Sequence, residues 1–226
     1  MMKVTELPTF RPENALQMGF LLPYYRSQPF HANLNSLNAS GIAMLNVDVL
    51  VILYHLARYT DGPVLELGGY VGGGSIAMGW GRRDGNKSSK VYSVELGGAY
   101  EHPTHGSKDI ARDLQENIRK HGVAERVKVT IGDSRSPDIV KRMHQLIGSA
   151  TVDLLCIDSD GMVQSDFDLY RDLLAPRAYL VVDDFFSPGA PNKVIPTRTC
   201  INSLETAGIV EPLGIYGWGT WVGRLK

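Results

Sequence analysis

Three aspartates end two apolar segments and could together bind a cation. Asp158 closes "TVDLLCID", and Asp183 and Asp184 close "AYLVVDD". If these segments are neighbouring strands of a parallel sheet, their carboxyl ends bring the three carboxylates to one edge. Carboxylates at such short distances repel one another unless they are paired. A hard divalent cation, which binds oxygen ligands of this kind, would remove the repulsion. Helix capping, or pairing with Arg177 or Arg198, is the structural alternative.

A fourth acid, Glu66, precedes a cluster of glycines in "VLELGGYVGGGS" (64–75). Glycine-rich turns after a strand usually hold a cofactor, because its bulk can approach the backbone there. The segment from Gly72 to Ala77 fits G-x-G-x-x-A, a dinucleotide pattern that is weak alone and starts four residues beyond the strand. A pyrophosphate would meet the Glu66 carboxylate at a cost of roughly 4 kcal/mol per like-charged pair. The ammonium and sulfonium of S-adenosylmethionine are positively charged, so their interaction with the Glu66 carboxylate would be attractive. Glu66, Gly68 and Gly72 therefore favour this cofactor.

Later acids extend this prediction to the nucleoside. Glu95 ends "VYSVEL" and could accept both hydroxyls of a ribose, which suits NAD equally well. In "IGDS", Asp133 and Ser134 follow the third strand, where the acid could bind the adenine amino group or cap the next helix. A capping role in a structural turn is also the alternative for Glu66. Further expected cofactor contacts are Tyr70, Ser75 and Asp158.

Strand-like and helix-like segments alternate from residue 46 to the C-terminus. Expected strands, rich in β-branched residues, are 63–67, 90–96, 126–133, 151–158 and 178–184. Expected helices are 46–58, 73–81, 107–122, 136–148, 165–176 and 195–208. The terminal "IVEPLGIYGWGTWVGRL" predicts a hairpin. The order predicts an α/β fold with a single Rossmann-like, doubly wound, mostly parallel seven-stranded sheet that ends in an antiparallel hairpin strand.

The first 45 residues predict an irregular N-terminal arm, since prolines at 8, 12, 23 and 29 interrupt them. We therefore expect residues 1–45 to form an arm or lid, and residues 46–226 to form one domain. Aromatic residues in the arm would suit a cover over the core, over a second subunit or over a substrate pocket. Trp218 and Trp221 of the hairpin would suit either a wall of the substrate pocket or a dimer contact, so that a homodimer is one arrangement compatible with the sequence.

Several motifs resemble those of class I S-adenosylmethionine-dependent methyltransferases in order and spacing. They are "ELGGYVGG", "VYSVEL", "IGDS", "LLCIDSDG" and "LVVDDFFSPGAP". More narrowly, residues 43–192 resemble the catechol O-methyltransferase-like branch, which depends on a divalent metal. The resemblance implies that "AMLNVD", with Met44, covers the cofactor. It also implies that Asp158 and Asp183 hold Mg²⁺ or another divalent cation, with Asp184 standing where the branch has an amide.

The chain departs from that branch at Gly161, where the branch carries a lysine as general base. Either the metal alone activates the acceptor, or another residue supplies the base. Asp160, His102 and His105 are the candidates by position, and a turn acid and a solvated loop are their structural alternatives. Asp158 would act in catalysis as a ligand of the metal.

These features predict transfer of a methyl group from S-adenosylmethionine to a hydroxyl of a small molecule, assisted by a divalent metal. Vicinal oxygens on the acceptor would suit the metal, as in a catechol, a sugar diol, a hydroxy acid or a natural-product intermediate. Three alternatives stay open. They are a metal-independent methyltransferase with an aspartate or histidine base, an NAD-linked oxidoreductase, and a non-catalytic nucleotide-binding protein.

Composition limits the partners. The 226 residues are 43% hydrophobic, which is enough for one α/β core. With 23 basic and 24 acidic residues the formal net charge is −1, and no nucleic-acid partner is expected. The longest apolar segment, 46–57, is too short for a membrane span and is interrupted by Asp48 and His55. Cys156 and Cys200 are expected to be reduced core thiols, and a cytoplasmic location is expected.

Overall fold

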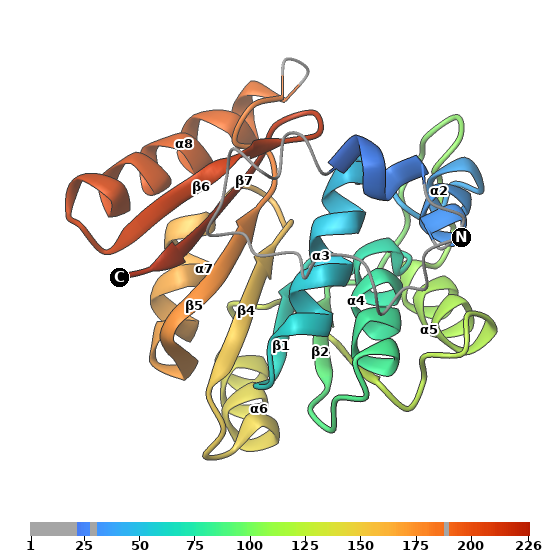
Figure 1. The fold of residues 1–226 in the computed structure, drawn as a ribbon, viewed down its shortest axis with the longest axis horizontal. Coiled ribbons are helices and arrows are strands. Elements are labelled where there is room, and N and C mark those ends of the chain that lie inside the picture. The colour runs from blue at the N-terminus through green and yellow to red at the C-terminus, as the bar shows by residue number, and fades with distance from the viewer. Residues whose placement is uncertain (1–21, 28–30, 188–189) are drawn as a thin grey trace.

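A single seven-stranded sheet organises the chain (Figure 1). The computed structural model describes residues 22–27, 31–187 and 190–226. The strand order is β3-β2-β1-β4-β5-β7-β6, and β7 runs antiparallel to both β5 and β6. The strands are β1 (Val64–Leu67), β2 (Val91–Glu95), β3 (Val127–Ile131), β4 (Val152–Ile157), β5 (Leu174–Val182), β6 (Val210–Tyr216) and β7 (Thr220–Leu225). The predicted mostly parallel, Rossmann-like sheet with a C-terminal hairpin is confirmed.

Helices cover both faces of this sheet (Figure 1). They are α2 (Ala32–Ala39), α3 (Val47–Tyr59), α4 (Gly73–Asp84), α5 (Ile110–Lys120), α6 (Pro137–Ile147), α7 (Val163–Tyr170) and α8 (Pro191–Thr206), with a 3₁₀ turn η3 (Arg171–Leu173). Successive side chains of β4 point to opposite faces of the sheet, so the strand contributes to the hydrophobic core on both faces. Leu154 and Cys156 pack in the cluster that contains α3 and α4, whereas Leu155 and Ile157 pack in the cluster that contains α7 and α8.

Two predicted segments were wrong in part. Residues 165–176 were expected to be one helix, but α7 ends at Tyr170 and β5 already starts at Leu174. The pattern misleads because Leu173 and Leu174 are both buried, as an amphipathic helix would also require. Within the arm expected to be irregular, residues 22–27 and 32–39 are helical. Leu34 and Leu37 of α2 are buried in the core, so helical spacing is present there.

The rest of the predicted arm, residues 1–21 and 28–30, lies outside the described residues, and the division at residue 45 stays a prediction. Both cysteines are free and buried, as expected. Among the described helices, none has the length and apolar character that crossing a membrane requires.

The hairpin of β6 and β7 is fastened to the end of β5. Phe186 donates its N–H to the Gly219 carbonyl at 3.0 Å, and the Thr220 hydroxyl donates to the Asp183 carboxylate. Gly219 has φ +138°, and a Cβ there would lie 1.7 Å from the Phe186 carbonyl oxygen. Glycine is therefore required at the hairpin tip, and the tip in turn positions Asp183.

Replacing this glycine should destabilise the fold. Gly219→Ala should lower the free energy of unfolding by about 3 kcal/mol, through the close backbone contact and the left-handed conformation. The control Gly122→Ala has φ +68° with nothing within 4 Å of its Cβ, and should lose only about 1 kcal/mol. Urea denaturation measures both. Equal losses would contradict the close contact.

Candidate functional site

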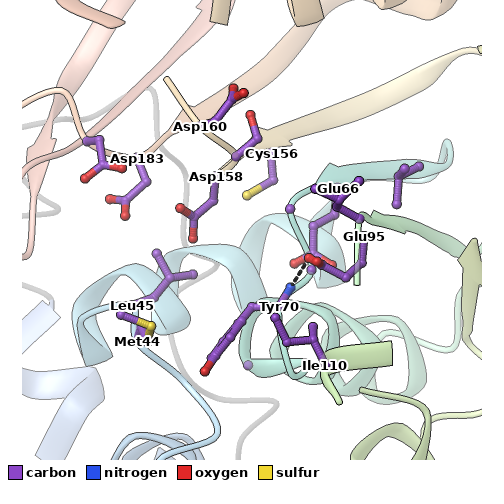
Figure 2. Close-up of a pocket in the computed structure, with 18 of the residues that line it drawn as sticks. Met44, Leu45, Glu66, Tyr70, Glu95, Ile110, Cys156, Asp158, Asp160 and Asp183 are labelled. Atoms are coloured by element: carbon purple, nitrogen blue, oxygen red, sulfur yellow. Dashed lines mark hydrogen bonds between the residues drawn. The ribbon is translucent and has the colours of Figure 1, made fainter. Parts of the chain in front are cut away.

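A cavity of about 660 Å³ lies at the carboxyl edge of the sheet, where β1, β2, β4 and β5 end (Figure 2). Most of the predicted site residues line it. These are Met44, Glu66, Gly68, Tyr70, Glu95, Asp133, Ser134, Asp158, Asp160, Asp183 and Asp184. Four predicted residues, Gly72, Ser75, His102 and His105, are not part of its wall.

Glu66 is buried at the base of this cavity. Its carboxylate accepts hydrogen bonds from the Ser75 hydroxyl of α4 and from the Ser93 hydroxyl of β2, the latter at 2.6 Å. Burial raises its pKa to about 7, against the lowering effect of the two serines. Ser75, predicted as a cofactor contact, thus contacts Glu66 and is not part of the cavity wall. Glu66 bonds two side chains rather than the backbone amides of a helix end, unlike the capping alternative.

The glycines around Glu66 allow close packing. A Cβ on Gly68, which has φ +91°, would lie 2.0 Å from the Asp158 carbonyl oxygen, so Gly68 lets the ends of β1 and β4 meet. In α4, a Cβ on Gly73 would lie 2.6 Å from the Ala43 Cα, and one on Gly74 would lie 2.4 Å from Glu66 Oε1. Of the two glycines that fit the dinucleotide pattern, Gly74 is thus accounted for by close packing, and Gly72 by its φ of +107°.

Glu95 ends β2 and orders two loops at the cavity. Its Oε2 accepts the Tyr70 N–H at 2.6 Å, which Figure 2 marks, and its Oε1 accepts the Gly97 N–H at 2.9 Å. Each carboxylate oxygen has a further lone pair for a ligand. Tyr70 adopts φ +46° and its hydroxyl donates to the His105 carbonyl. The loop after β2 is thereby fastened to the turn after β1.

The two histidines of that loop contact each other and their neighbours. His102 stacks on Tyr100, with ring centroids 6.0 Å apart, and its Nδ1 accepts the His105 N–H at 3.1 Å. The Thr104 hydroxyl lies 2.7 Å from His105 Nδ1. Tyr100 lines the cavity, but neither histidine is part of its wall. This placement lends no support to either histidine as a base.

Arg135 contacts two of the acids that line the cavity, Asp160 and Asp133. Its guanidinium donates to both oxygens of Asp160, at 2.8 and 2.6 Å, and holds the pKa of Asp160 below its ordinary value. Its backbone N–H donates to Asp133 Oδ1 at 2.9 Å, whereas Ser136 is the N-cap of α6. Ser134 donates to Asp166 at 2.8 Å. Asp160 is an ion-paired acid, which argues against its role as a base.

The three aspartates predicted as a cluster do meet. One carboxylate oxygen from each of Asp158, Asp183 and Asp184 lies within 4.8 Å of the others. Hydrogen bonds between neighbouring strands position two of them. The Asp158 N–H donates to the Leu67 carbonyl of β1 at 2.8 Å, and the Asp183 N–H donates to the Ile157 carbonyl of β4 at 3.0 Å. Burial raises the pKa of Asp158 well above its ordinary range, and the neighbouring Asp183 raises it further.

Sequence reasoning missed the cation beside this cluster. Lys193, in the first turn of α8, places its Nζ 3.1 Å from Asp184 Oδ2 and 2.9 Å from the Ser159 carbonyl. The arginines considered from the sequence lie elsewhere, since Arg177 pairs with Glu211 and Arg198 lies over the Phe185 ring. The helix was expected to start at residue 195, so Lys193 was not recognised as a residue of its first turn, where the helix dipole disfavours a cation.

The comparison with protein families identifies the class. Residues 65–185 match the model of a methyltransferase domain family. That segment contains the Glu66 turn, the Glu95 loop and all three clustered aspartates. The chain therefore belongs to this methyltransferase family, and the predicted class, an S-adenosylmethionine-dependent methyltransferase, is confirmed.

Solved structures share the fold over nearly the whole chain. The O-methyltransferase TomG from Streptomyces achromogenes, involved in tomaymycin synthesis and solved with S-adenosylmethionine, is 18% identical, with a TM-score of 0.64 over 94% of this chain and 98% of its own. Cofactor-bound Rv0187 from MTB is 20% identical, with a TM-score of 0.65 over 96% and 98%. The methyltransferase PaMTH1 from Podospora anserina, bound to S-adenosylhomocysteine, is 17% identical, with a TM-score of 0.61 over 94% and 88%.

The buried Glu66 should make stability depend on pH. Its pKa is raised from 4.5 to about 7 in the folded chain, so the native state binds the extra proton. That stabilisation is complete below pH 4.5 and is lost as the pH rises through 7. Between pH 5 and 8, the wild type should lose about 2 to 3 kcal/mol of unfolding free energy relative to Glu66→Gln.

Urea denaturation at both pH values, without cofactor, measures this difference. Glu125→Gln removes an exposed acid and should show no such change relative to the wild type. A pH-independent difference between wild type and Glu66→Gln would show that Glu66 is ionised throughout.

Proposed function

We propose that this protein transfers the methyl group of S-adenosylmethionine to a hydroxyl of a small molecule, assisted by a divalent metal ion. One observation carries the proposal. A single cavity holds the acids suited to the cofactor, Glu66 and Glu95, together with the acidic cluster Asp158, Asp183 and Asp184. A cofactor and an acceptor can therefore meet inside it.

The cofactor would bind beside β1 and β2. Glu95 would accept the ribose hydroxyls, and Asp133 or Ser134 would face the adenine. Glu66, with Gly68 and the backbone of Tyr70, would favour the positively charged amino acid end. The cavity volume of about 660 Å³ lies within the range of small-molecule sites.

The acidic cluster fits a hard divalent ion. Its three side chains offer only carboxylate oxygens, and each is partly exposed to the cavity, as Mg²⁺ or Mn²⁺ requires. Asp158, Asp183 and Asp184 would hold the ion. When bound, it would lower the pKa of an acceptor hydroxyl and orient it.

The chain's own side chains would position the acceptor. Met44, Phe186 and Trp218 line the cavity and are 40%, 56% and 64% exposed, whereas Trp221 of the same hairpin is buried. Their apolar surfaces would cover the acceptor and exclude water from the methyl group in transit. An acceptor with an apolar portion beside its hydroxyl suits these surfaces. The synthesis named for TomG makes a natural-product intermediate a reasonable first choice for screening.

The cofactor half of this proposal is tested by calorimetry with S-adenosylhomocysteine. The wild type should bind, and Glu95→Gln should bind at least about tenfold more weakly, because a charged acceptor of the ribose is lost. Glu101→Gln changes an exposed acid of the adjoining loop and should bind as the wild type does. Absence of binding to the wild type would overturn the proposal.

The metal half is tested by chelation. Once a tritiated-methyl screen of catechols, diols and hydroxy acids has found an acceptor, EDTA should abolish transfer and Mg²⁺ should restore it. Asp158→Asn should lower kcat by at least about a hundredfold, whereas the exposed control Asp172→Asn should not. Transfer that survives EDTA would instead favour the metal-independent alternative with an aspartate base.

A further inference from the structure

Lys193 brings a fixed positive charge into the acidic cluster. Its ammonium lies 3.1 Å from Asp184 Oδ2, and it is anchored by a 2.9 Å hydrogen bond to the Ser159 carbonyl, next to Asp158 in the chain. Lys193 also lines the cavity. The ammonium thus lies between the ends of β4 and β5, on the side of α8.

Gly161 leaves room for the backbone of Lys193 beside the cluster. A Cβ on Gly161 would lie 2.8 Å from the Lys193 Cα and 3.0 Å from its carbonyl oxygen. Gly161 also has φ +87°, a conformation that favours glycine. A side chain at residue 161 would therefore push away the start of α8 and withdraw Lys193 from the cluster.

The position of Lys193 in its helix also points to a specific partner. It is the third residue of α8, and the first turn of that helix contains no acid. A cation at this end meets the positive end of the helix dipole. The compensating charge comes from Asp184, together with Asp158 and Asp183, which all stabilise the ammonium.

We propose that Lys193 is a built-in counter-cation of the acidic cluster, which competes with a divalent ion for Asp184 and so sets the affinity of the site. The ion would displace the ammonium from Asp184 on binding. Lys193 is thus a positioning residue that keeps the three carboxylates together when no ion is bound. This inference rests on the proposed metal site.

Charge counting gives the expected pattern. In the fully deprotonated form that would bind an ion, the cluster with Lys193 paired to Asp184 has the charge of two carboxylates, and removing both partners leaves that charge unchanged. Removing Lys193 alone leaves three uncompensated carboxylates, and removing the Asp184 charge alone leaves an ammonium beside two. Ion affinity follows the local charge, since unit charges a few ångströms apart interact strongly even at an effective dielectric near 20.

A double-mutant cycle with Mn²⁺ tests the inference by calorimetry. Lys193→Met should bind Mn²⁺ at least about tenfold more tightly than the wild type, and Asp184→Asn at least about tenfold more weakly. The double variant should return to within about threefold of the wild type. Lys141→Met, which removes an exposed lysine of α6, should leave the affinity unchanged.

The outcomes separate this inference from the proposed function. Weaker or unchanged Mn²⁺ binding by Lys193→Met, or a double variant no tighter than Asp184→Asn, would overturn the competition. Absence of Mn²⁺ binding in every variant, Lys193→Met included, would overturn both the metal site and the counter-cation. S-adenosylhomocysteine binding, measured on the same samples, reports separately whether the cofactor half stands and whether each variant is folded.

Discussion

Negative charge gathered at one sheet edge is the constraint on which this site depends. Parallel strands end on the same side, so acids at the carboxyl ends of β1, β2, β4 and β5 meet around one cavity whatever their separation in the chain. Ionised carboxylates at such short distances destabilise the fold unless each is paired with a hydrogen-bond donor or a cation. Compensation takes four forms here. Serine hydroxyls donate hydrogen bonds to Glu66, and backbone amides donate to Glu95. Arg135 forms an ion pair with Asp160, and Lys193 forms one with Asp184.

These compensations differ in what they leave for a ligand. Glu66 and Glu95 are held by neutral donors and retain acceptor capacity toward a cationic nucleoside. Asp160 is neutralised by a bidentate arginine and offers little. Once deprotonated, the cluster with Asp158 would keep excess negative charge even beside Lys193, and a divalent ion would balance that excess. On the proposed function, the cavity would therefore have a cofactor end and a metal end, which differ in how their acids are paired.

Much of the site could be predicted from sequence because strand ends are local signals. Apolar β-branched segments that close on an acid place Glu66, Glu95, Asp158 and Asp183 at the edge without further information. What escaped prediction depends on tertiary packing. Lys193 reaches the cluster from a helix that starts at Pro191, eight residues beyond Asp183, and the histidines after β2 are not part of the cavity wall. The strand that starts at Leu174 was predicted as helix for a similar reason. The residues there are buried, and burial alone is compatible with a helix or a strand.

A crystal structure with S-adenosylhomocysteine and Mn²⁺, recorded at the manganese absorption edge, would show whether one cavity binds both the cofactor and the ion. We expect the ribose against Glu95, the amino acid end of the cofactor beside Gly68, and an anomalous peak among the carboxylates of Asp158, Asp183 and Asp184. A cavity that excludes the nucleoside, or density for a phosphate-bearing ligand beside Gly68, would rule out this arrangement.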